Sequence, residues 1–258
     1  AVKLMQYKER VEFMAIKTFK RYELKYILDR NQYEAVKAGI APYVESDAYC
    51  VGGKTYGLFN IYYDTDDYAI IRHSISKPPF KEKLRLRSYY ENPGNDDKVF
   101  IELKKKADGC VNKRRVTMKY GDALKFLETG VCEKTGDYMH DMVAHEIEHF
   151  LKSYKVRPKA FIAYDRAAYF LKTNKKIRIT FDTNVRGGPA QYGAAGCVPL
   201  LRDGLYLMEI KVSDHIPLPI VKVLTANRVF RHGFSKYGTY YTDNIYNSEE
   251  IKENARVY

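Results

Sequence analysis

Basic side chains occupy every second position in several short stretches of this chain. In the stretch 80–90, Lys83, Arg85 and Arg87 alternate with leucines, so the three cations would share one face of a β-strand. Guanidinium and ammonium groups match the oxygen atoms of phosphate groups in charge and in hydrogen-bonding geometry. The spacing therefore predicts a surface that binds a phosphate-bearing polyanion.

Carboxylates stand at alternate positions among the cations, in the stretches that contain Glu23, Glu102 and Glu209. A phosphate site gains nothing from a neighbouring carboxylate unless a metal ion bridges the two. Mg²⁺ and Mn²⁺ prefer oxygen ligands of this kind alongside substrate phosphates. The mixture of charges predicts a divalent cation, Mn²⁺ or Mg²⁺, in the same site.

The chain has 258 residues and a net charge of +12, and this charge is unevenly distributed. Between residues 77 and 119, thirteen Lys and Arg stand against six Asp and Glu. A local surplus of this kind indicates a polyanionic partner, which could be nucleic acid, an anionic membrane or a phosphate chain.

The four cysteines are widely spaced and form no paired metal motif, which favours free thiols in a reducing compartment. No apolar run approaches the roughly 18 residues of a membrane span. We therefore expect a cytoplasmic protein, and a place at the inner face of a membrane stays open. Residues 1–18 are interpreted as a leader or an added segment, and residues 19–258 as a single domain.

Alternation of polar and apolar residues predicts strands joined by short turns, with Asp108-Gly109 as the turn of one hairpin. The predicted strands are 19–28, 56–64, 80–90, 98–106, 111–119, 159–171, 175–182 and 205–212. Helices are predicted from the cap residue Asp29 to near Pro42 and at 66–76, 121–130, 137–154 and 219–230, with a glycine-rich excursion at 186–204.

Strands outnumber helices and follow each other closely, which favours an α+β fold built on an antiparallel sheet. If the sheet were open, the charged face would simply be solvated. If it closes into a β-barrel, helices pack on the apolar outer face and the charged residues line the bore. We expect the second arrangement, a closed antiparallel β-barrel with peripheral helices.

Seven short motifs, in order, resemble those of the VTC-type polyphosphate polymerase domain, a member of the triphosphate tunnel metalloenzymes that also include the CYTH phosphatases. The resemblance covers about residues 19–241. The motifs are 21–26 (RYELKY), 62–65 (YYDT), 83–87 (KLRLR), 100–104 (FIELK), 164–169 (YDRAAY), 207–211 (LMEIK) and 234–237 (FSKY).

The resemblance implies phosphate-binding roles for the basic residues of these motifs and a metal-binding role for Glu209, to which Glu23 and Glu102 could contribute. For the lysine of the NKRR stretch the register is open, so Arg114 or Arg115 could replace Lys113. The expected catalytic residues are Arg85, Arg87, Lys104, Arg166 and Lys236, and the expected substrate-binding residues are Lys25, Lys83, Lys113, Arg178, Lys211 and Ser235.

Two positions depart from the pattern of the wider family. Arg21 stands where the superfamily has the first glutamate of Glu-x-Glu-x-Lys, so one expected metal ligand is replaced by a cation. Gly233 precedes Phe-Ser-Lys where a basic residue is common, and Arg231 could compensate. The first departure favours a phosphate-chain binder over a metal-rich hydrolase.

The expected function is transfer of the terminal phosphoryl group of ATP to a growing inorganic polyphosphate chain. A tripolyphosphatase or nucleoside triphosphatase of the same fold is the rival enzyme, and a polyphosphate sensor that only binds is the rival outside enzymes. The expected ligands are ATP and polyphosphate. We expect no nucleic-acid partner, and a membrane-protein partner stays open.

His145, Glu146 and His149 form a literal H-E-x-x-H on a predicted helix. In a zinc protease the two imidazoles would bind the metal and the glutamate would activate water. No further ligand motif follows, and a protease would leave the cationic strands unexplained, so we interpret this stretch as a solvated helix face. Interleaved Tyr and basic residues could also suggest single-stranded nucleic acid, but no known nucleic-acid module is present.

Overall fold

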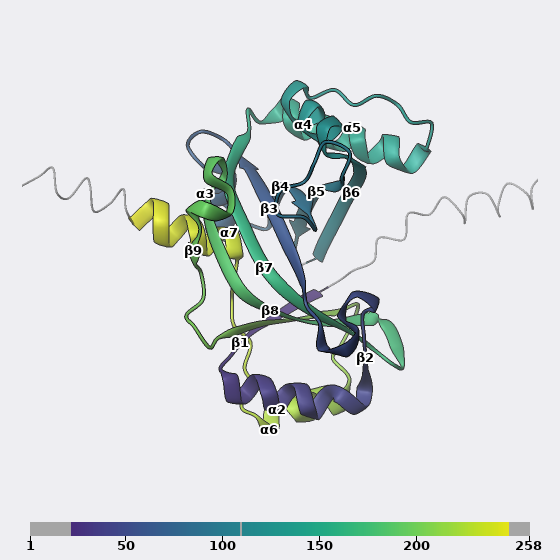
Figure 1. Ribbon diagram of the computed structural model, residues 1–258, viewed down its shortest axis with the longest axis vertical. Coiled ribbons are helices and arrows are strands. Elements are labelled where there is room, and N and C mark those ends of the chain that lie inside the picture. The colour runs from purple at the N-terminus through teal and green to yellow at the C-terminus, as the bar shows by residue number, and fades with distance from the viewer. Residues whose placement is uncertain (1–21, 109, 248–258) are drawn as a thin grey trace, which may run out of the picture.

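One large antiparallel sheet organises the chain (Figure 1). The structure is a computed structural model that describes residues 22–108 and 110–247. Paired strands follow the order β1-β10-β8-β7-β3-β4-β5-β6, and β2 and β9 pair with β7 and β8. The strands are β1 (Tyr22–Leu28), β2 (Val44–Ser46), β3 (Tyr56–Asp64), β4 (Phe80–Ser88), β5 (Lys98–Ala107), β6 (Cys110–Lys119), β7 (Arg157–Leu171), β8 (Asn174–Pro189), β9 (Val198–Pro199) and β10 (Tyr206–Val212).

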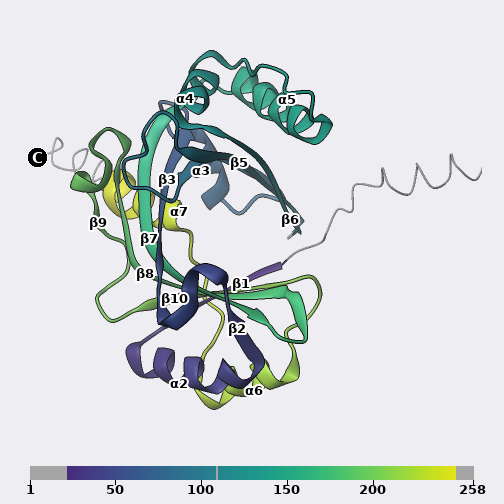
Figure 2. The ribbon, with the colours of Figure 1, turned by 45° about the vertical axis from the view of Figure 1, so that its right-hand side comes forward.

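The sheet curls strongly, so that its two end strands face each other across a concave side (Figure 2). Strands β1 and β6 come into contact there. In the part of the chain that the structure describes, no backbone ladder joins these two strands. The α+β class with a large antiparallel sheet is confirmed, whereas full closure into a barrel stays a prediction.

Helices pack on the curled sheet in three groups, each over its own apolar cluster. Two groups lie on the outer side, and the third, α3 with α7, lies on the concave side, where Tyr237 stacks on Tyr62, the residue opposite Arg85. Helices α2 and α6 cover β1, β8 and β10, where Val36 and Leu224 belong to the same apolar cluster as Ile179. Helices α4 and α5 cover β4, β5 and β6. Helices α3 and α7 share the third cluster with β3 and β7. The helices are α2 (Arg30–Ile40), α3 (Ala69–Ile75), α4 (Tyr120–Thr129), α5 (Tyr138–Ser153), α6 (Leu218–Ala226) and α7 (Lys236–Tyr241).

Local capping fixes where the helices begin. Asp29 accepts a hydrogen bond from the Gln32 backbone N–H, and the Gln32 side chain accepts one from the Asp29 backbone, which completes a capping box at α2. The buried Asp64, at the end of β3, accepts hydrogen bonds from the backbone N–H groups of Ile70 and Ile71 and from the Tyr237 hydroxyl. Asp64 therefore ties α3 and α7 to the sheet.

The glycine-rich stretch 186–204 does not begin as a loop. Strand β8 continues to Pro189, so the predicted end at residue 182 is seven residues too early. A Cβ atom at Gly188 would lie 2.3 Å from the Gly196 carbonyl oxygen, and one at Gly187 would lie 2.8 Å from Ile162 Cδ1. These glycines permit close approach within a strand, which composition alone does not distinguish from a turn.

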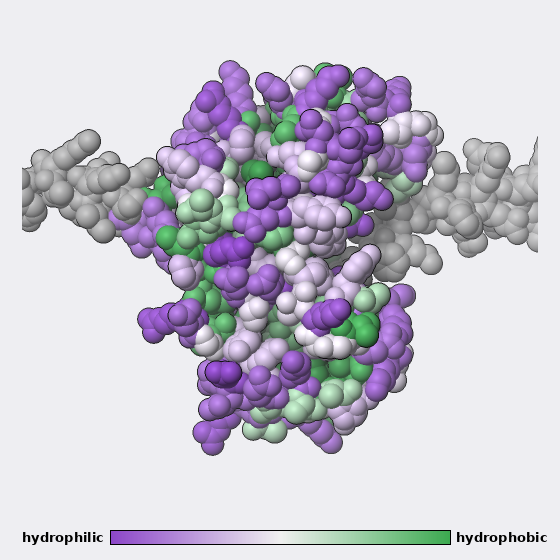
Figure 3. Space-filling view, viewed as in Figure 1, coloured by the Kyte–Doolittle hydropathy of each residue, from purple (hydrophilic) through white to green (hydrophobic). Residues whose placement is uncertain are grey.

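The outer surface is mostly hydrophilic on the face shown in Figure 3, with hydrophobic residues scattered in small areas. Among the described residues, no helix combines the length and the apolar character that a membrane crossing requires.

Candidate functional site

The strand register places the alternating charges on one face of the sheet. Lys83, Arg85 and Arg87 of β4 lie opposite Lys104, Glu102 and Phe100 of β5. On β1 and β10, Lys25 lies opposite Glu209 and Glu23 opposite Lys211. The Lys104 Nζ atom reaches Glu23 Oε2 at 2.6 Å, from β5 across to β1. Only side chains on the concave face can bridge the sheet in this way.

Glu102 is completely buried and holds together the first cluster of cations. Arg85 donates from Nε and Nη2 to Glu102 Oε2 at 2.8 and 2.6 Å, and Lys113 Nζ donates to Oε1 at 2.9 Å. Arg87 Nη1 lies 3.7 Å from the same carboxylate. Burial raises the pKa of Glu102, but Arg85, Arg87 and Lys113 together hold that pKa well below its usual range. Glu102 is thus a fixed anion that orients cations.

Asp182 anchors the second cluster. Arg166 donates from Nε and Nη2 to the two oxygens of Asp182 at 2.6 and 2.7 Å, and Lys236 Nζ donates to Oδ2 at 2.6 Å. Burial raises the pKa of Asp182, but Arg166 and Lys236 lower it below its ordinary value overall. Asp182 alternates with Arg178 in the predicted strand 175–182, but the sequence pattern predicted no role for it.

Glu209 lies in the middle of four cations, and all of them stand further away than a short hydrogen bond. Its Oε1 atom is 3.5 Å from Lys25 Nζ and 3.6 Å from Lys236 Nζ. Its Oε2 atom is 3.7 Å from Arg166 Nη2 and 3.8 Å from Lys211 Nζ. Burial raises the pKa of Glu209, but the surrounding cations hold it well below the usual range.

This geometry fits a hard cation at Glu209. The residue is charged, only 6% exposed, and not held at short range by Lys or Arg. Glu23 lies close by, because Lys211 Nζ is 3.8 Å from both carboxylates. Glu102 belongs to the other cluster. The three expected metal ligands are therefore divided between two clusters, and within the described residues no group of three or more His, Cys, Asp and Glu side chains is arranged to hold a metal.

Two lysines of the concave face, Lys83 and Lys211, carry strongly depressed pKa values. Burial, together with the nearby Lys25 and Lys104, lowers the pKa of Lys83 to about 7. Burial lowers the pKa of Lys211 to about 8, although Glu23 and Glu209 oppose this shift. The concave face therefore confines more positive charge than its own carboxylates neutralise.

Helix α7 contributes through its first turn and the segment before it. Ser235 is the N-cap, and its hydroxyl accepts a hydrogen bond from the Gly238 backbone N–H at 3.1 Å. Lys83 Nζ donates to the same hydroxyl at 3.3 Å, and Lys25 Nζ donates to the Phe234 carbonyl at 2.7 Å. The helix thereby brings Ser235 and Lys236 to the cations of β1 and β4.

Tyr164 lies between the two clusters, and sequence reasoning gave it no role although it begins the YDRAAY motif. Its hydroxyl accepts a hydrogen bond from Arg87 Nη2 at 3.1 Å. Lys236 Nζ and Arg166 Cζ stand 4.3 and 5.1 Å from its ring centroid. Burial raises the pKa of Tyr164, but Arg87, Arg166 and Lys236 outweigh burial and lower it to about 8.

The register resolves the ambiguity of the NKRR stretch. Lys113 contacts Glu102 on the concave face, whereas Arg114 pairs with Glu146 of α5 at 3.3 Å on the outer face. Arg115 shares the concave side and stands over the Phe100 ring. Lys113 is therefore the residue that joins the first cluster.

Arg178 stands apart from both clusters. Its Nη2 atom donates to Asp47 Oδ2 at 2.9 Å and to the Tyr56 hydroxyl at 3.0 Å. It therefore supports the loop before β3. Its predicted substrate contact stays a prediction.

The H-E-x-x-H stretch lies on α5, outside the concave face. Glu146 pairs with Lys105 Nζ at 2.7 Å and with Arg114, so it attaches α5 to β5 and β6. His145 and His149 are exposed. These contacts agree with a solvated helix face attached to the sheet.

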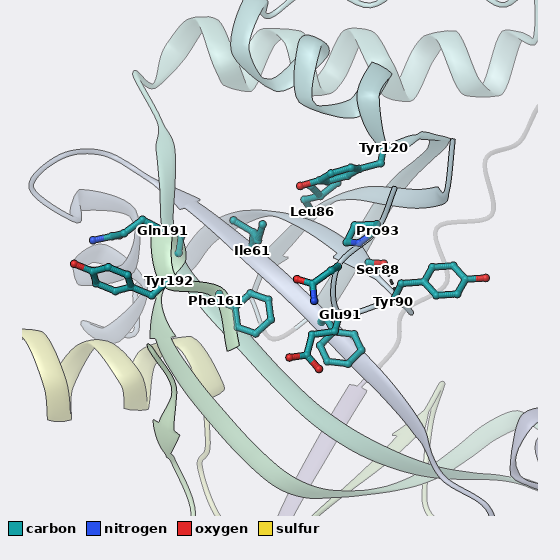
Figure 4. A pocket seen from close by; sticks show the side chains of 14 residues that line it. Ile61, Leu86, Ser88, Tyr90, Glu91, Pro93, Tyr120, Phe161, Gln191 and Tyr192 are labelled. Carbon is teal, nitrogen blue, oxygen red and sulfur yellow. Dashed lines mark hydrogen bonds between the residues drawn. The ribbon is translucent and has the colours of Figure 1, made fainter. Parts of the chain in front are cut away.

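A cavity of about 390 Å³ opens on the outer side of β3 and β4 (Figure 4). Ile61, Leu86 and Phe161 lie at its centre, and Tyr90 and Tyr192 line its two sides, with their rings directed outward. None of the predicted site residues lines this cavity. It is separate from the charged face.

The fold and this face define the class: an α+β protein with a curled antiparallel sheet whose concave side is lined by Lys, Arg and a few buried carboxylates. The sequence model of the VTC domain family matches residues 20–242, so the chain belongs to this family. This confirms the family that the seven motifs predicted.

Several known proteins are similar to this chain. Vacuolar transporter chaperone complex subunit 4 of Schizosaccharomyces pombe is 24% identical over 161 residues, which are 53% of this chain and 22% of that protein. A Bacillus halodurans protein named a candidate adenylate cyclase gives a TM-score of 0.48 at 13% identity, over 84% of this chain and 95% of the other. The Mimivirus capping enzyme triphosphatase gives a TM-score of 0.34 at 10% identity, over 86% of this chain and 94% of the other. The chain thus spans 22% of the yeast relative's length.

Proposed function

We propose that the concave face transfers the terminal phosphoryl group of ATP to a growing inorganic polyphosphate chain. The observation that carries this proposal is the charge balance of the two clusters and the lysines around them. Nine cationic side chains surround four buried or half-buried carboxylates. A linear chain of phosphates supplies the missing negative charge along the length of the face.

The side chains of this face would act by positioning and by neutralising charge. Arg85 and Arg87 on one side, and Arg166 and Lys236 on the other, would hold consecutive phosphates in line. A terminal phosphate oxygen of the polyphosphate attacks the γ-phosphorus of ATP, the bond from that phosphorus to the β–γ bridging oxygen breaks, and ADP leaves. Such transfer requires little covalent participation by the protein. Buried guanidinium groups fixed by Glu102 and Asp182 meet this requirement.

Glu209, with Glu23 beside it, would hold Mn²⁺ or Mg²⁺ together with phosphate oxygens, and the bound ion would neutralise charge on the transferred phosphoryl group. Hard cations in nucleotide enzymes commonly use one or two carboxylates plus substrate phosphates. The long distances from Glu209 to its neighbouring cations support this assignment.

The yeast relative is named as a subunit of a vacuolar transporter chaperone complex. We extend to this chain a cytoplasmic location and a membrane-protein partner as part of the proposal. Co-purification of the chain with membranes from its own source tests this part.

The decisive experiment is product analysis. Purified protein is incubated with ATP and Mn²⁺ or Mg²⁺, and the products are resolved on a gel that separates long-chain polyphosphate from free phosphate. Long chains are expected. If free phosphate is the only product, the protein is a triphosphatase and not a polymerase, because water then takes the place of the acceptor phosphate. Tight polyphosphate binding with no product would identify a sensor.

A further inference from the structure

Four aromatic rings form a continuous row at one end of the concave face. Tyr49 and Tyr56 have their centroids 6.2 Å apart, Tyr56 and Tyr89 5.9 Å, and Tyr89 and Phe100 5.7 Å. All three contacts are edge-to-face. We call this row the aromatic rim. Its members come from four different segments, so only the fold brings them together.

The aromatic rim directly adjoins the phosphate-binding cations proposed above. Tyr89 follows Arg87 by two residues, just beyond the end of β4, and its ring contacts Phe100, which lies opposite Arg87. Tyr56 lies opposite Arg166 in the pairing of β3 with β7. Arg115 Cζ stands 4.7 Å from the Phe100 centroid at the far end of the row. A molecule that contacts Arg87 and Arg166 therefore ends next to aromatic rings.

Tyr49 and Tyr89 are 78% and 46% exposed, so their rings are available to a ligand. The row is also held in place, since Arg178 donates to the Tyr56 hydroxyl at 3.0 Å. The face of an aromatic ring carries partial negative charge, so it does not attract a phosphate group. It stacks well on another planar π system, and base–aromatic stacking is tolerant of base identity.

We propose that the aromatic rim binds the base of a nucleoside triphosphate whose phosphates lie on Arg87 and Arg166. This inference rests on the proposed function and deepens it, because it assigns ATP, rather than an inorganic phosphate chain, to this end of the concave face. The growing polyphosphate then extends from the opposite end, where Lys83 and Ser235 lie.

The test compares two ligands that share a triphosphate and differ in the base. Affinities of the full chain for ATP and for inorganic tripolyphosphate are measured by calorimetry without divalent metal, so that no turnover occurs. Tyr49→Ala and Tyr89→Ala are each expected to weaken ATP binding about fivefold or more and to leave tripolyphosphate binding within about twofold. Tyr89→Phe, which keeps the ring, is expected to bind ATP like the wild type.

Tyr90→Ala is the matched control. Tyr90 is the next residue, is 56% exposed, and lines the cavity on the other side of the sheet (Figure 4). It is expected to change neither affinity. Equal weakening of both ligands by Tyr89→Ala, or unchanged ATP binding in both alanine variants, would overturn the proposal.

Arg85→Ala separates this proposal from the proposed function. This variant is expected to bind both ATP and tripolyphosphate more weakly than the wild type. If it weakens neither while Tyr89→Ala still weakens ATP alone, the phosphate site is wrong and the aromatic rim stands. A wild-type protein that binds neither ligand rejects both.

Discussion

Arg166 and Asp182 lie directly opposite each other on β7 and β8, and the guanidinium of Arg166 donates to both oxygens of the Asp182 carboxylate. Both side chains are almost fully buried, and Lys236 joins the same carboxylate from α7. The pair therefore fixes Arg166 before any ligand arrives. Buried pairs of this kind cost much more to break than to leave intact.

Asp182→Asn is expected to lower the free energy of unfolding by about 3–5 kcal/mol, because Arg166 and Lys236 lose the charge that compensates them. Urea denaturation measures this. Saturating tripolyphosphate is expected to restore part of the loss, since it supplies negative charge to the same cations. The control is Asp165→Asn on the neighbouring position, where the carboxylate accepts from Asn184 in an exposed setting. A change above about 1 kcal/mol in that control would show that the method reports general strand damage.

Arg87→Ala is expected to remove about 2–4 kcal/mol of transition-state stabilisation, which lowers the turnover rate on the order of a hundredfold, and to change the free energy of unfolding little. Arg87 donates mainly to the neutral groups of Asn60 and Tyr164. Arg85→Ala is expected to lower turnover at least as much, and to lower the stability too, because Arg85 makes the close pair with the buried Glu102. Arg114→Ala, on the outer face, serves as the control for both. Near wild-type turnover in both Arg85→Ala and Arg87→Ala would remove β4 from the site.

Glu209→Gln separates metal-dependent turnover from binding. The change keeps the shape and removes the charge that a hard cation requires. Tripolyphosphate binding without metal is expected to persist or to tighten, since one repulsive carboxylate is gone. Product formation across a Mn²⁺ titration is expected to collapse. Full activity with an unchanged metal optimum would exclude Glu209 from the site.

The affinity for tripolyphosphate is expected to fall as the pH rises from 7 to 9. The pKa of Lys83 is about 7 and that of Lys211 about 8 in the free protein, and a bound polyanion favours the protonated form of each. Binding near pH 8 should take up on the order of one proton, which calorimetry in buffers of different ionisation enthalpy measures. Lys83→Met should reduce the uptake. Proton release on binding would contradict this account.

The same two pKa values determine the direction in which the stability of the free protein changes with pH. In the unfolded chain both lysines keep their protons until about pH 10.4. The unfolded state therefore binds more protons than the folded state between about pH 7 and 10, so the two lysines make the free energy of unfolding increase with pH in this window. Thermal unfolding without ligand at pH 7 and pH 9 checks the direction.

The histidines of α5 are expected to be dispensable. The double change of His145→Ala and His149→Ala should leave phosphoryl transfer intact, because both side chains are exposed and away from the concave face. Elemental analysis of the purified wild type is expected to find no stoichiometric zinc. One tightly held zinc ion per chain would contradict the interpretation of this stretch as a solvated helix face.

Local periodicity predicted most strands and the charged face, because side-chain alternation is a property of each strand alone. The register could not be predicted in this way. In NKRR a shift of one residue exchanges Lys113 for Arg114, and only the pairing of β6 with β5 decides which one meets Glu102. The roles of Asp182 and Tyr164 depend on partners from distant strands, so no local signal could reveal them. Gly187 and Gly188 resemble loop residues in composition, although close packing explains them.

Where the two ends of the sheet meet, Lys104 and Glu23 form an ion pair at 2.6 Å, and the part of the chain that is described contains no backbone ladder between β1 and β6. A closed ring releases a long polymer only by its end, since the chain has to be threaded. A seam that is bridged by side chains opens more easily than a backbone ladder does, because a half-exposed ion pair contributes far less free energy than a row of backbone hydrogen bonds. Within the described residues, the Lys104–Glu23 ion pair is therefore one of the contacts on which threading or sideways release of a polymer would depend.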